Sequence, residues 1–208
     1  MVKNKFNLKQ IIMGKKILVV VDYQYDFFNP DGALYVNGGE KLFDKILNII
    51  PNFEHVIFTQ DWHPFDHCSF TNNGGIWPVH CVAGTIGAGI PVEFMKAAKS
   101  FSCCTKGEDE NKEEYGAFSN ARSLAIECDY DFEYIDFYND EFINKSFNDV
   151  DEIVVCAIAG DYCVLETLKN IINHIGADKV KVYLDGIVSI DGGEKLNNFI
   201  KENNIKTY

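Results

Sequence analysis

The sequence predicts an α/β protein, with a single domain built on a mostly parallel central sheet that has helices on both faces. Two observations lead to this fold class. Short β-branched runs alternate along the chain with segments whose apolar residues recur at helical spacing, as in βαβ units. The most apolar runs, at 16–22 and 152–158, are unbroken rather than alternating, which indicates strands covered on both faces.

The elements follow in chain order. The expected strands are 16–22 (KILVVVD), 55–61 (HVIFTQD), 101–106 (FSCCTK), 132–137 (FEYIDF), 152–158 (EIVVCAI) and 179–185 (KVKVYLD). One helical stripe of apolar residues spans 42–50 and is closed by Pro51. A second spans 164–175 and ends at Gly176. The crossovers that join parallel strands are expected to be right-handed.

Length and composition narrow the class of protein. We expect one domain over 14–208, with residues 1–13 as an N-terminal extension, because Met13 stands just before the first strand. The net charge of −12 argues against a nucleic-acid or anionic-membrane partner. No run approaches the roughly 20 apolar residues of a membrane span, and the N-terminus does not resemble a signal peptide. Seven scattered cysteines without a CxxC pair indicate a reducing, cytoplasmic setting and argue against a thiol-redox protein.

Reactive side chains collect where the expected strands end. Asp22, Asp61 and Lys106 close the first three strands, and Cys163 follows the strand at 152–158. Because an open parallel sheet holds its active site beyond the carboxyl ends of the strands, these side chains are expected to meet.

The run DWHPFDH, followed by WPVHC at 77–81, offers four metal-ligating side chains, Asp61, His63, His67 and His80. Pro64 disfavours helix at His63, so the spacing is that of a loop able to wrap around an ion. One carboxylate and three imidazoles would leave positions open for water or substrate. The alternative is that these are solvated loop residues, as single Asp and His residues usually are.

Cys163 is expected at the first turn of the second helix, where the helix dipole and free N–H groups stabilise a thiolate. Lys106 would lower its pKa further, and Asp22 could take the proton. The alternative interpretation is that Cys163 is a small buried residue of the core without a catalytic role. Asp161 is expected to cap the helix or brace the loop. Tyr162 is expected to pack or to line the pocket, and packing is the favoured alternative.

Seven stretches together resemble the nicotinamidase/pyrazinamidase group of the isochorismatase-like cysteine hydrolases. They are VVVDYQYDF (19–27), TQDWHPFDHCSF (59–70), WPVHCVAGTIGA (77–88), TKG (105–107), YGAF (115–118), AIAGDYCV (157–164) and DGIVSIDGG (185–193). They occur in the family's order and cover the chain from about Met13 nearly to its end. A set of ordered, separated motifs is far more specific than any one of them.

The resemblance implies the isochorismatase-like hydrolase fold and a role for each matching residue. Asp22, Lys106 and Cys163 would be catalytic, and the N–H groups of Ala159 and Cys163 would form the oxyanion hole. Phe27 and Trp77 would sandwich the substrate ring. Asp61, His63, His67 and His80 would bind one divalent metal ion, zinc first, with iron(II) or manganese as alternatives. The bond between Ile158 and Ala159 would be cis.

The function implied is conversion of nicotinamide to nicotinic acid and ammonia through a cysteine thioester, in NAD salvage. Pyrazinamide is a second candidate substrate, and a homo-oligomer is considered. The alternatives are a related amidase acting on another small amide and a non-catalytic metal- or ligand-binding protein. Isochorismatases and N-carbamoylsarcosine-type amidases lack this metal set, which counts against them.

Three features depart from the family's pattern. Tyr25 stands where asparagine is common and is expected to narrow the pocket or to pack beside it. Gly160 replaces a threonine, serine or small apolar residue and is expected to loosen the loop. The acidic segment 119–150 is interpreted as an extra surface element, considered as an oligomer contact.

Overall fold

The computed structural model describes residues 16–119 and 150–208. Six strands form one sheet in the order β3-β2-β1-β4-β5-β6, and every neighbouring pair is parallel. The strands are β1 (Lys16–Val21), β2 (His55–Asp61), β3 (Phe101–Lys106), β4 (Glu152–Ile158), β5 (Val180–Val188) and β6 (Lys206–Thr207). The predicted fold class is therefore confirmed. The predicted strand at 132–137, the extension 1–13 and most of the acidic segment 119–150 lie outside the described residues.

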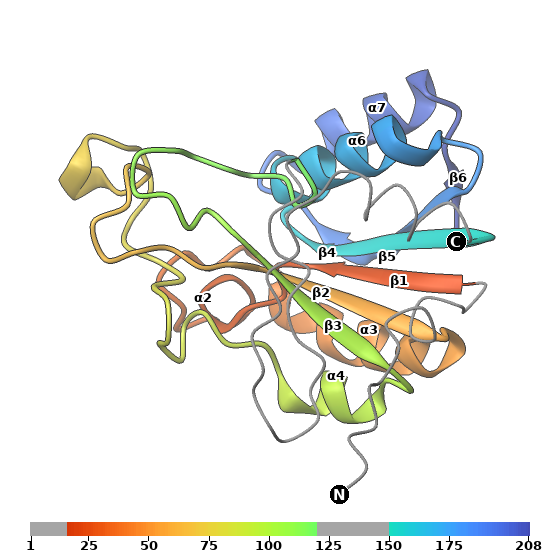
Figure 1. Ribbon diagram of the computed structural model, residues 1–208, viewed down its shortest axis with the longest axis horizontal. Coiled ribbons are helices and arrows are strands. Elements are labelled where there is room, and N and C mark those ends of the chain that lie inside the picture. Colours follow the sequence, from red (N-terminus) through yellow and green to blue (C-terminus); the bar gives the residue numbers. More distant parts are fainter. Residues whose placement is uncertain (1–15, 120–149) are drawn as a thin grey trace, which may run out of the picture.

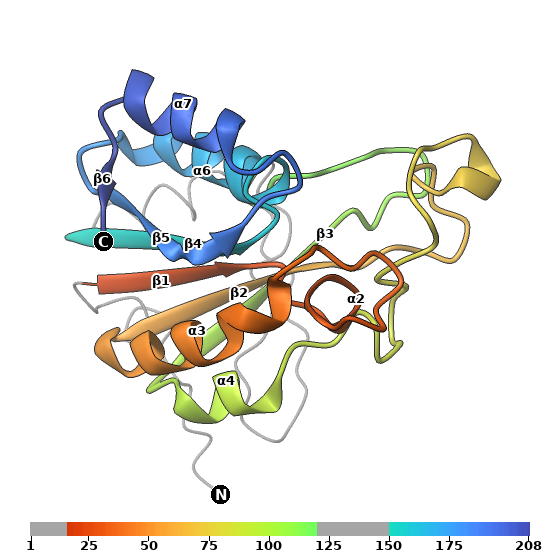
Figure 2. The ribbon, with the colours of Figure 1, turned by 180° about the vertical axis from the view of Figure 1, so that it is seen from behind.

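Helices cover both faces of the sheet (Figures 1 and 2). On one face lie α6 (Cys163–Ile175) and α7 (Glu194–Glu202), and on the other α3 (Phe43–Ile49) and α4 (Val92–Ala97). Shorter pieces are α2 (Tyr25–Phe28), η1 (Gly39–Leu42), η2 (Ile50–Asn52) and η3 (Thr71–Asn73). No helix in the two described ranges is long and apolar enough to span a membrane.

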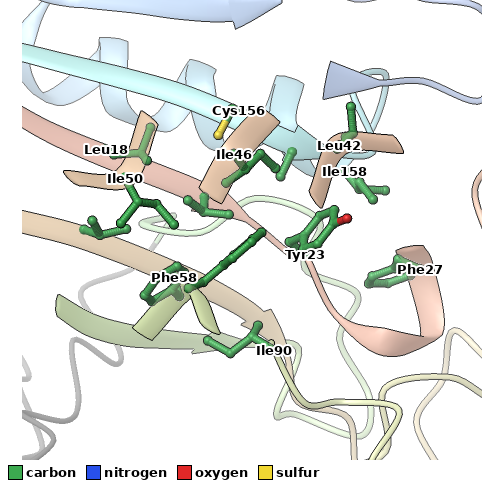
Figure 3. Close-up of a cluster of buried hydrophobic side chains, with 14 of the residues drawn as sticks. Leu18, Tyr23, Phe27, Leu42, Ile46, Ile50, Phe58, Ile90, Cys156 and Ile158 are labelled. Carbon is green, nitrogen blue, oxygen red and sulfur yellow. The ribbon is translucent and has the colours of Figure 1, made fainter. Parts of the chain in front are cut away.

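The unbroken apolar strands arise because successive side chains of β1 enter two different cores. Ile17 and Val19 point into the core beneath α6 and α7, whereas Leu18 and Val20 point into the core beneath α3 and α4. Figure 3 shows part of the second core, including Leu18. Burial on both faces fixes the pairing register, because a slip of one residue would exchange the two sets.

Besides the short pieces of three or four residues, three of the described elements were not anticipated from the sequence. The helix α4 has only six residues, and β6 has two. The helix α7 buries only Leu196 and Ile200, a narrow stripe in a segment otherwise rich in polar residues. Its i, i+4 spacing was the signal that could have revealed it. Strand β5 also runs three residues beyond the predicted end, to Val188, past a register shift against β4.

The sheet register places the site. Asp61 is the last residue of β2 and lies opposite Lys106, the last residue of β3. Asp22 follows β1, the next strand across, and Cys163 begins α6 just beyond β4. The four side chains therefore converge at the carboxyl edge of four adjacent strands, as the parallel arrangement requires.

Candidate active site

The turn between β4 and α6 presents the thiol. The bond between Ile158 and Ala159 is cis, as expected. The Ala159 carbonyl accepts the N–H groups of Tyr162 at 3.1 Å and Val164 at 3.0 Å, which closes the turn. Among the described residues, the hydrogen bonds of this turn use neither the Ala159 N–H nor the Cys163 N–H. These two donors remain available beside the Cys163 sulfur, at the positive end of a 13-residue helix.

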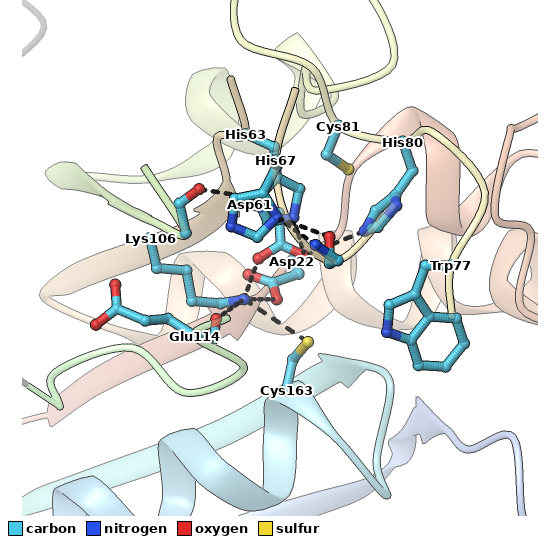
Figure 4. A network of polar contacts seen from close by, with 12 residues as sticks. Asp22, Asp61, His63, His67, Trp77, His80, Cys81, Lys106, Glu114 and Cys163 are labelled. Atoms are coloured by element: carbon cyan, nitrogen blue, oxygen red, sulfur yellow. Dashed lines mark hydrogen bonds and ion pairs between the residues drawn. The ribbon is translucent and has the colours of Figure 1, made fainter. Parts of the chain in front are cut away.

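Lys106 joins the polar groups of the site (Figure 4). Its Nζ lies 2.8 Å from Asp22 Oδ2 and 3.7 Å from Cys163 Sγ, and it also pairs with Asp61 Oδ1. The Lys106 side chain is nearly fully buried. One ammonium thus compensates two buried carboxylates, without which either carboxylate would be an uncompensated buried charge.

Asp22 is held in an uncommon backbone conformation. Its φ is +48°, in the left-handed region that few side chains other than Asn and Asp adopt. Thr59 stabilises this geometry, since its carbonyl accepts the Asp22 N–H at 3.2 Å and its hydroxyl donates to Asp22 Oδ1 at 2.6 Å. An Asp22 oxygen and the Cys163 sulfur lie within 4.8 Å of each other. The carboxylate is therefore positioned beside the thiol with limited freedom to turn away.

Burial dominates the protonation of the site. Burial would lower the pKa of Lys106, but Asp22 and Asp61 raise it well above its usual value, so the ammonium stays charged. Burial raises the pKa of Cys163 well above its usual value; Lys106 opposes the rise, and the two carboxylates add to it. The pKa of the thiol is thus shifted upward, opposite to the shift expected from the helix dipole and Lys106.

The pKa of Asp22 is shifted in the direction that suits a general base. Burial raises its pKa, against the opposing charge of Lys106, and the charge of Asp61 adds to the rise. A carboxyl group whose pKa is raised accepts a proton more readily than an ordinary aspartate does. The site thus pairs a protonated thiol with a neighbouring base of increased proton affinity.

Three of the predicted metal ligands converge. Donor atoms of Asp61, His63 and His80 lie within 4.8 Å of one another. The Nδ1 atoms of His63 and His80 lie 2.8 Å from the backbone oxygens of Gly107 and Pro78 respectively. A carbonyl oxygen only accepts, so each Nδ1 carries the proton and each Nε2 presents a lone pair. The two Nε2 atoms face Asp61 Oδ2 at 3.7 and 3.9 Å.

These residues fit a divalent ion. Two imidazole lone pairs and one carboxylate, with second hydrogen bonds that fix the ring orientations, form the kind of donor set that holds such ions in proteins. His67 lies beside this group, and its ring stacks on that of His63 with centroids 4.1 Å apart. Its Nε2 is 3.0 Å from the Lys112 carbonyl and its Nδ1 is 2.7 Å from Ser69 Oγ. In this arrangement both His67 nitrogens are engaged, so its role as a ligand stays a prediction.

A pocket opens between the thiol and the three ligands. About 410 Å³ of space not filled by atoms lies within it, and part of that space is open to solvent. Phe27 and Trp77 line it, as expected of ring-binding walls. Its remaining lining residues are Leu34, Val36, Asp61, His80, Glu113, Tyr115, Ala159, Tyr162, Cys163 and Ile190. Apolar walls with a polar end suit a flat ring that carries a polar substituent.

Two tyrosines line the pocket. Tyr162 lines the pocket and also packs edge to face against Trp77, with centroids 5.3 Å apart, so both of its expected roles are present. The Trp77 Nε1–H donates to the Tyr115 hydroxyl at 3.1 Å. Tyr115 therefore orients the Trp77 wall. The motif YGAF at 115–118 was the only signal in the sequence for this residue.

Gln24 is a buried positioning residue that was missed in the sequence. Its Nε2 donates to the backbone oxygens of Asp61 and Ala88, each at 2.8 Å, and its Oε1 accepts the Asp61 N–H at 2.8 Å. This pair of reciprocal bonds joins the end of β2 to the segment after β1. The side chain thereby fixes the backbone that carries the carboxylate of Asp61.

The remaining expectations concern the loops. Asp161 braces the loop after β5, since its carboxylate accepts the N–H groups of Ile190 at 2.8 Å and Asp191 at 3.1 Å. Tyr25 packs against Phe28 and is not among the residues that line the pocket. Gly160 does not loosen its turn. A β-carbon there would overlap with Ser189 Oγ and come within 2.9 Å of Ile187 Cγ2, so the neighbouring loop already fills the space.

The fold is that of the isochorismatase-like hydrolases. The chain superposes on an isochorismatase-like hydrolase from Alkaliphilus metalliredigens with a TM-score of 0.66 and 18% identity, covering 93% of each chain, a likeness that shows the fold. It is 32% identical over 195 residues to a nicotinamidase of Escherichia coli, covering 84% of this chain and 83% of the relative. The chain belongs to the nicotinamidase family.

Solved structures agree with this assignment. A pyrazinamidase of Pyrococcus horikoshii in complex with zinc superposes with a TM-score of 0.73 and 29% identity, covering 93% of this chain and 98% of the other. No family model matches the chain. The similarity therefore rests on whole-chain relatives, each covered over most of its length.

Proposed function

We propose that this protein is a nicotinamidase, an amide hydrolase that converts nicotinamide to nicotinic acid and ammonia through a cysteine thioester. The observation that carries the proposal is the position of Lys106 Nζ, which reaches the thiol of Cys163 and pairs with the carboxylates of Asp22 and Asp61. Membership of the nicotinamidase family supplies the substrate.

The first half of the reaction acylates the thiol. Asp22 removes the proton from Cys163 as the sulfur attacks the amide carbon, and Lys106 stabilises the negative charge on the sulfur. The N–H groups of Ala159 and Cys163 donate to the oxygen of the tetrahedral intermediate. Asp22 then returns the proton to the departing ammonia, and a thioester remains.

The second half releases the acid. Water attacks the thioester carbonyl, and Asp22 takes a proton from that water. The same N–H groups of Ala159 and Cys163 stabilise the second tetrahedral intermediate. Collapse of this intermediate breaks the carbon–sulfur bond, returns a proton to the sulfur and frees nicotinic acid. A single base with a raised pKa serves both halves, because each begins with removal of a proton from a nucleophile.

The pocket residues orient the ring. Phe27 and Trp77 would hold the pyridine between aromatic faces, with the carboxamide directed at Cys163. Asp61, His63 and His80, joined by His67, would bind a divalent ion. Zinc is the first choice because the P. horikoshii relative is a zinc complex, and iron(II) or manganese are alternatives that the same donors suit. When bound, the ion would supply a fixed positive charge that anchors the ring nitrogen directly or through water.

The wider setting belongs to the same proposal. Release of nicotinic acid would feed NAD salvage in the cytoplasm, and pyrazinamide would be a second substrate because it presents a similar ring and the same carboxamide. The net charge of −12 supports a small-molecule substrate rather than a nucleic acid or a membrane surface. Assembly as a homo-oligomer, and a single domain over 14–208, are part of the proposal.

Ammonia release from nicotinamide tests the proposal. The purified protein is treated with a chelator, supplied with zinc, iron(II) or manganese, and compared with Cys163→Ala. The control is Cys156→Ala, which removes a thiol buried in the core within β4. Turnover should disappear in Cys163→Ala, persist in Cys156→Ala, and fall and recover with metal. Metal retention without hydrolysis of nicotinamide or other small amides would instead favour a non-catalytic binding protein.

A further inference from the structure

Glu113 is a pocket residue that the predicted site did not include. It lies on the segment 107–118 that follows β3, and its half-buried side chain lines the same pocket as Asp61 and His80. One of its oxygens, Oε1, accepts the Glu114 N–H at 3.0 Å, which limits how the carboxylate turns. A partly desolvated carboxylate facing a ligand pocket calls for a positive partner.

The segment that carries Glu113 is tied to the loop of the metal ligands. The Cys68 N–H donates to the Glu110 carbonyl at 2.7 Å, and the Lys112 carbonyl lies 3.0 Å from His67 Nε2. The Trp62 N–H donates to the Lys106 carbonyl at 2.9 Å. These bonds hold the backbone that leads up to Glu113 against the loop that follows β2.

Two three-donor groups share one histidine. The first contains Asp61, His63 and His80, and the second contains His63, His67 and Glu113. In the second group, the donor atoms again lie within 4.8 Å of one another. His67 has both nitrogens engaged, as described above, whereas a Glu113 oxygen lies close to the histidine common to both groups. Glu113 is therefore placed to add a donor on the His67 side of the centre.

We propose that Glu113 is a further carboxylate donor of the metal centre, supplied by the segment after β3 rather than by the loop that follows β2. With Asp61 it would bring two negative charges, which match the charge of a divalent cation. The inference deepens and rests on the proposed function, since it concerns the metal centre of that site. It also explains why a second carboxylate, besides that of Asp61, lines a mostly apolar pocket.

Metal affinity without substrate tests the inference. Apo protein, Glu113→Gln and the matched control Glu110→Gln are titrated with Zn²⁺ against a chromophoric chelator. Glu110 carries the same charge on the same segment but has an exposed side chain. We expect Glu113→Gln to bind Zn²⁺ at least about 10–100-fold more weakly, because loss of even an outer partner of a ligand costs that much. Glu110→Gln should bind as the unaltered protein does.

Visible absorption of the Co²⁺-substituted proteins gives a second readout, because the intensity of these bands depends on coordination. The bands should change in Glu113→Gln and stay the same in Glu110→Gln. An unchanged zinc affinity and cobalt spectrum in Glu113→Gln would overturn the inference, and so would an equal loss in Glu110→Gln. Neither readout uses amide hydrolysis, so a failure of the proposed function is distinguished from a failure of this inference.

Discussion

Replacing Lys106 by methionine would remove the single cation that compensates two buried carboxylates. Asp22 is 0% exposed and Asp61 is 5% exposed, and both pair with the Lys106 ammonium. Methionine keeps much of the aliphatic side chain, so the change is mainly one of charge. Breaking a buried pair by removing one partner costs about 3–5 kcal/mol. For a chain of this size that corresponds to a fall in melting temperature of roughly 6–20 °C.

Thermal and urea unfolding in the presence of EDTA measure this effect. The loss in free energy of unfolding caused by Lys106→Met should be largest near pH 7 and become smaller as the pH falls. Without the ammonium the pKa of Asp22 rises further, so the folded variant takes up a proton before the unfolded chain does. Zinc should restore part of the loss, because a bound cation would compensate Asp61.

The control for this prediction is Lys169→Met, which removes the same charge from a surface pair with Glu166 on α6. Such pairs contribute about 0–1 kcal/mol. The reasoning would be refuted if Lys106→Met in EDTA at pH 7 were as stable as the unaltered protein, or if Lys169→Met lost as much.

The remaining predictions concern residues outside the polar network. Burial lowers the pKa of His55 to about 4 from 6.5, so the unfolded chain gains a proton between those values while the folded protein does not. The free energy of unfolding, measured in urea, should therefore fall by about 3 kcal/mol between pH 6.5 and pH 4 because of His55. The variant His55→Gln should lack this part of the pH dependence. Gly160→Ala should cost about 1–3 kcal/mol through overlap with Ser189, as thermal unfolding will show. The double variant with Ser189→Ala should recover much of that loss, and a double variant no more stable than the single one would contradict the packing argument.

Much of the fold could be predicted because the strong strands carry local signals. Strands β2, β3 and β4 begin and end where the sequence predicts. The apolar runs reflect burial on two faces, and each ends where polar groups begin. The helix α7 was missed because its buried stripe is only two residues wide, and residues 120–149, which include one predicted strand, lie outside the described part of the chain.

Some residues of the site could be predicted from the sequence and others could not, and the difference has a physical reason. Residues at strand ends, such as Asp22 and Lys106, could be located because parallel strands deliver their ends to one edge. Gln24 and Glu113 could not, since loops have no periodicity and a single polar residue in a loop is usually solvated. Their roles depend on contacts between segments far apart in the chain.

What the sequence determined by itself is the set of elements and the reactive residues that end them, because hydrophobic period and strand termination are local properties. Only the tertiary structure decided which of these residues lie beside the single ammonium group of Lys106. Register places Asp61 opposite Lys106, and the order of the strands adds Asp22 and Cys163 beside them. It also decided the direction in which the pKa of Cys163 shifts, because burial and two nearby carboxylates raise it against the opposing charge of Lys106. Electrostatic energies depend on distance and desolvation, and both exist only after distant parts of the chain have packed together.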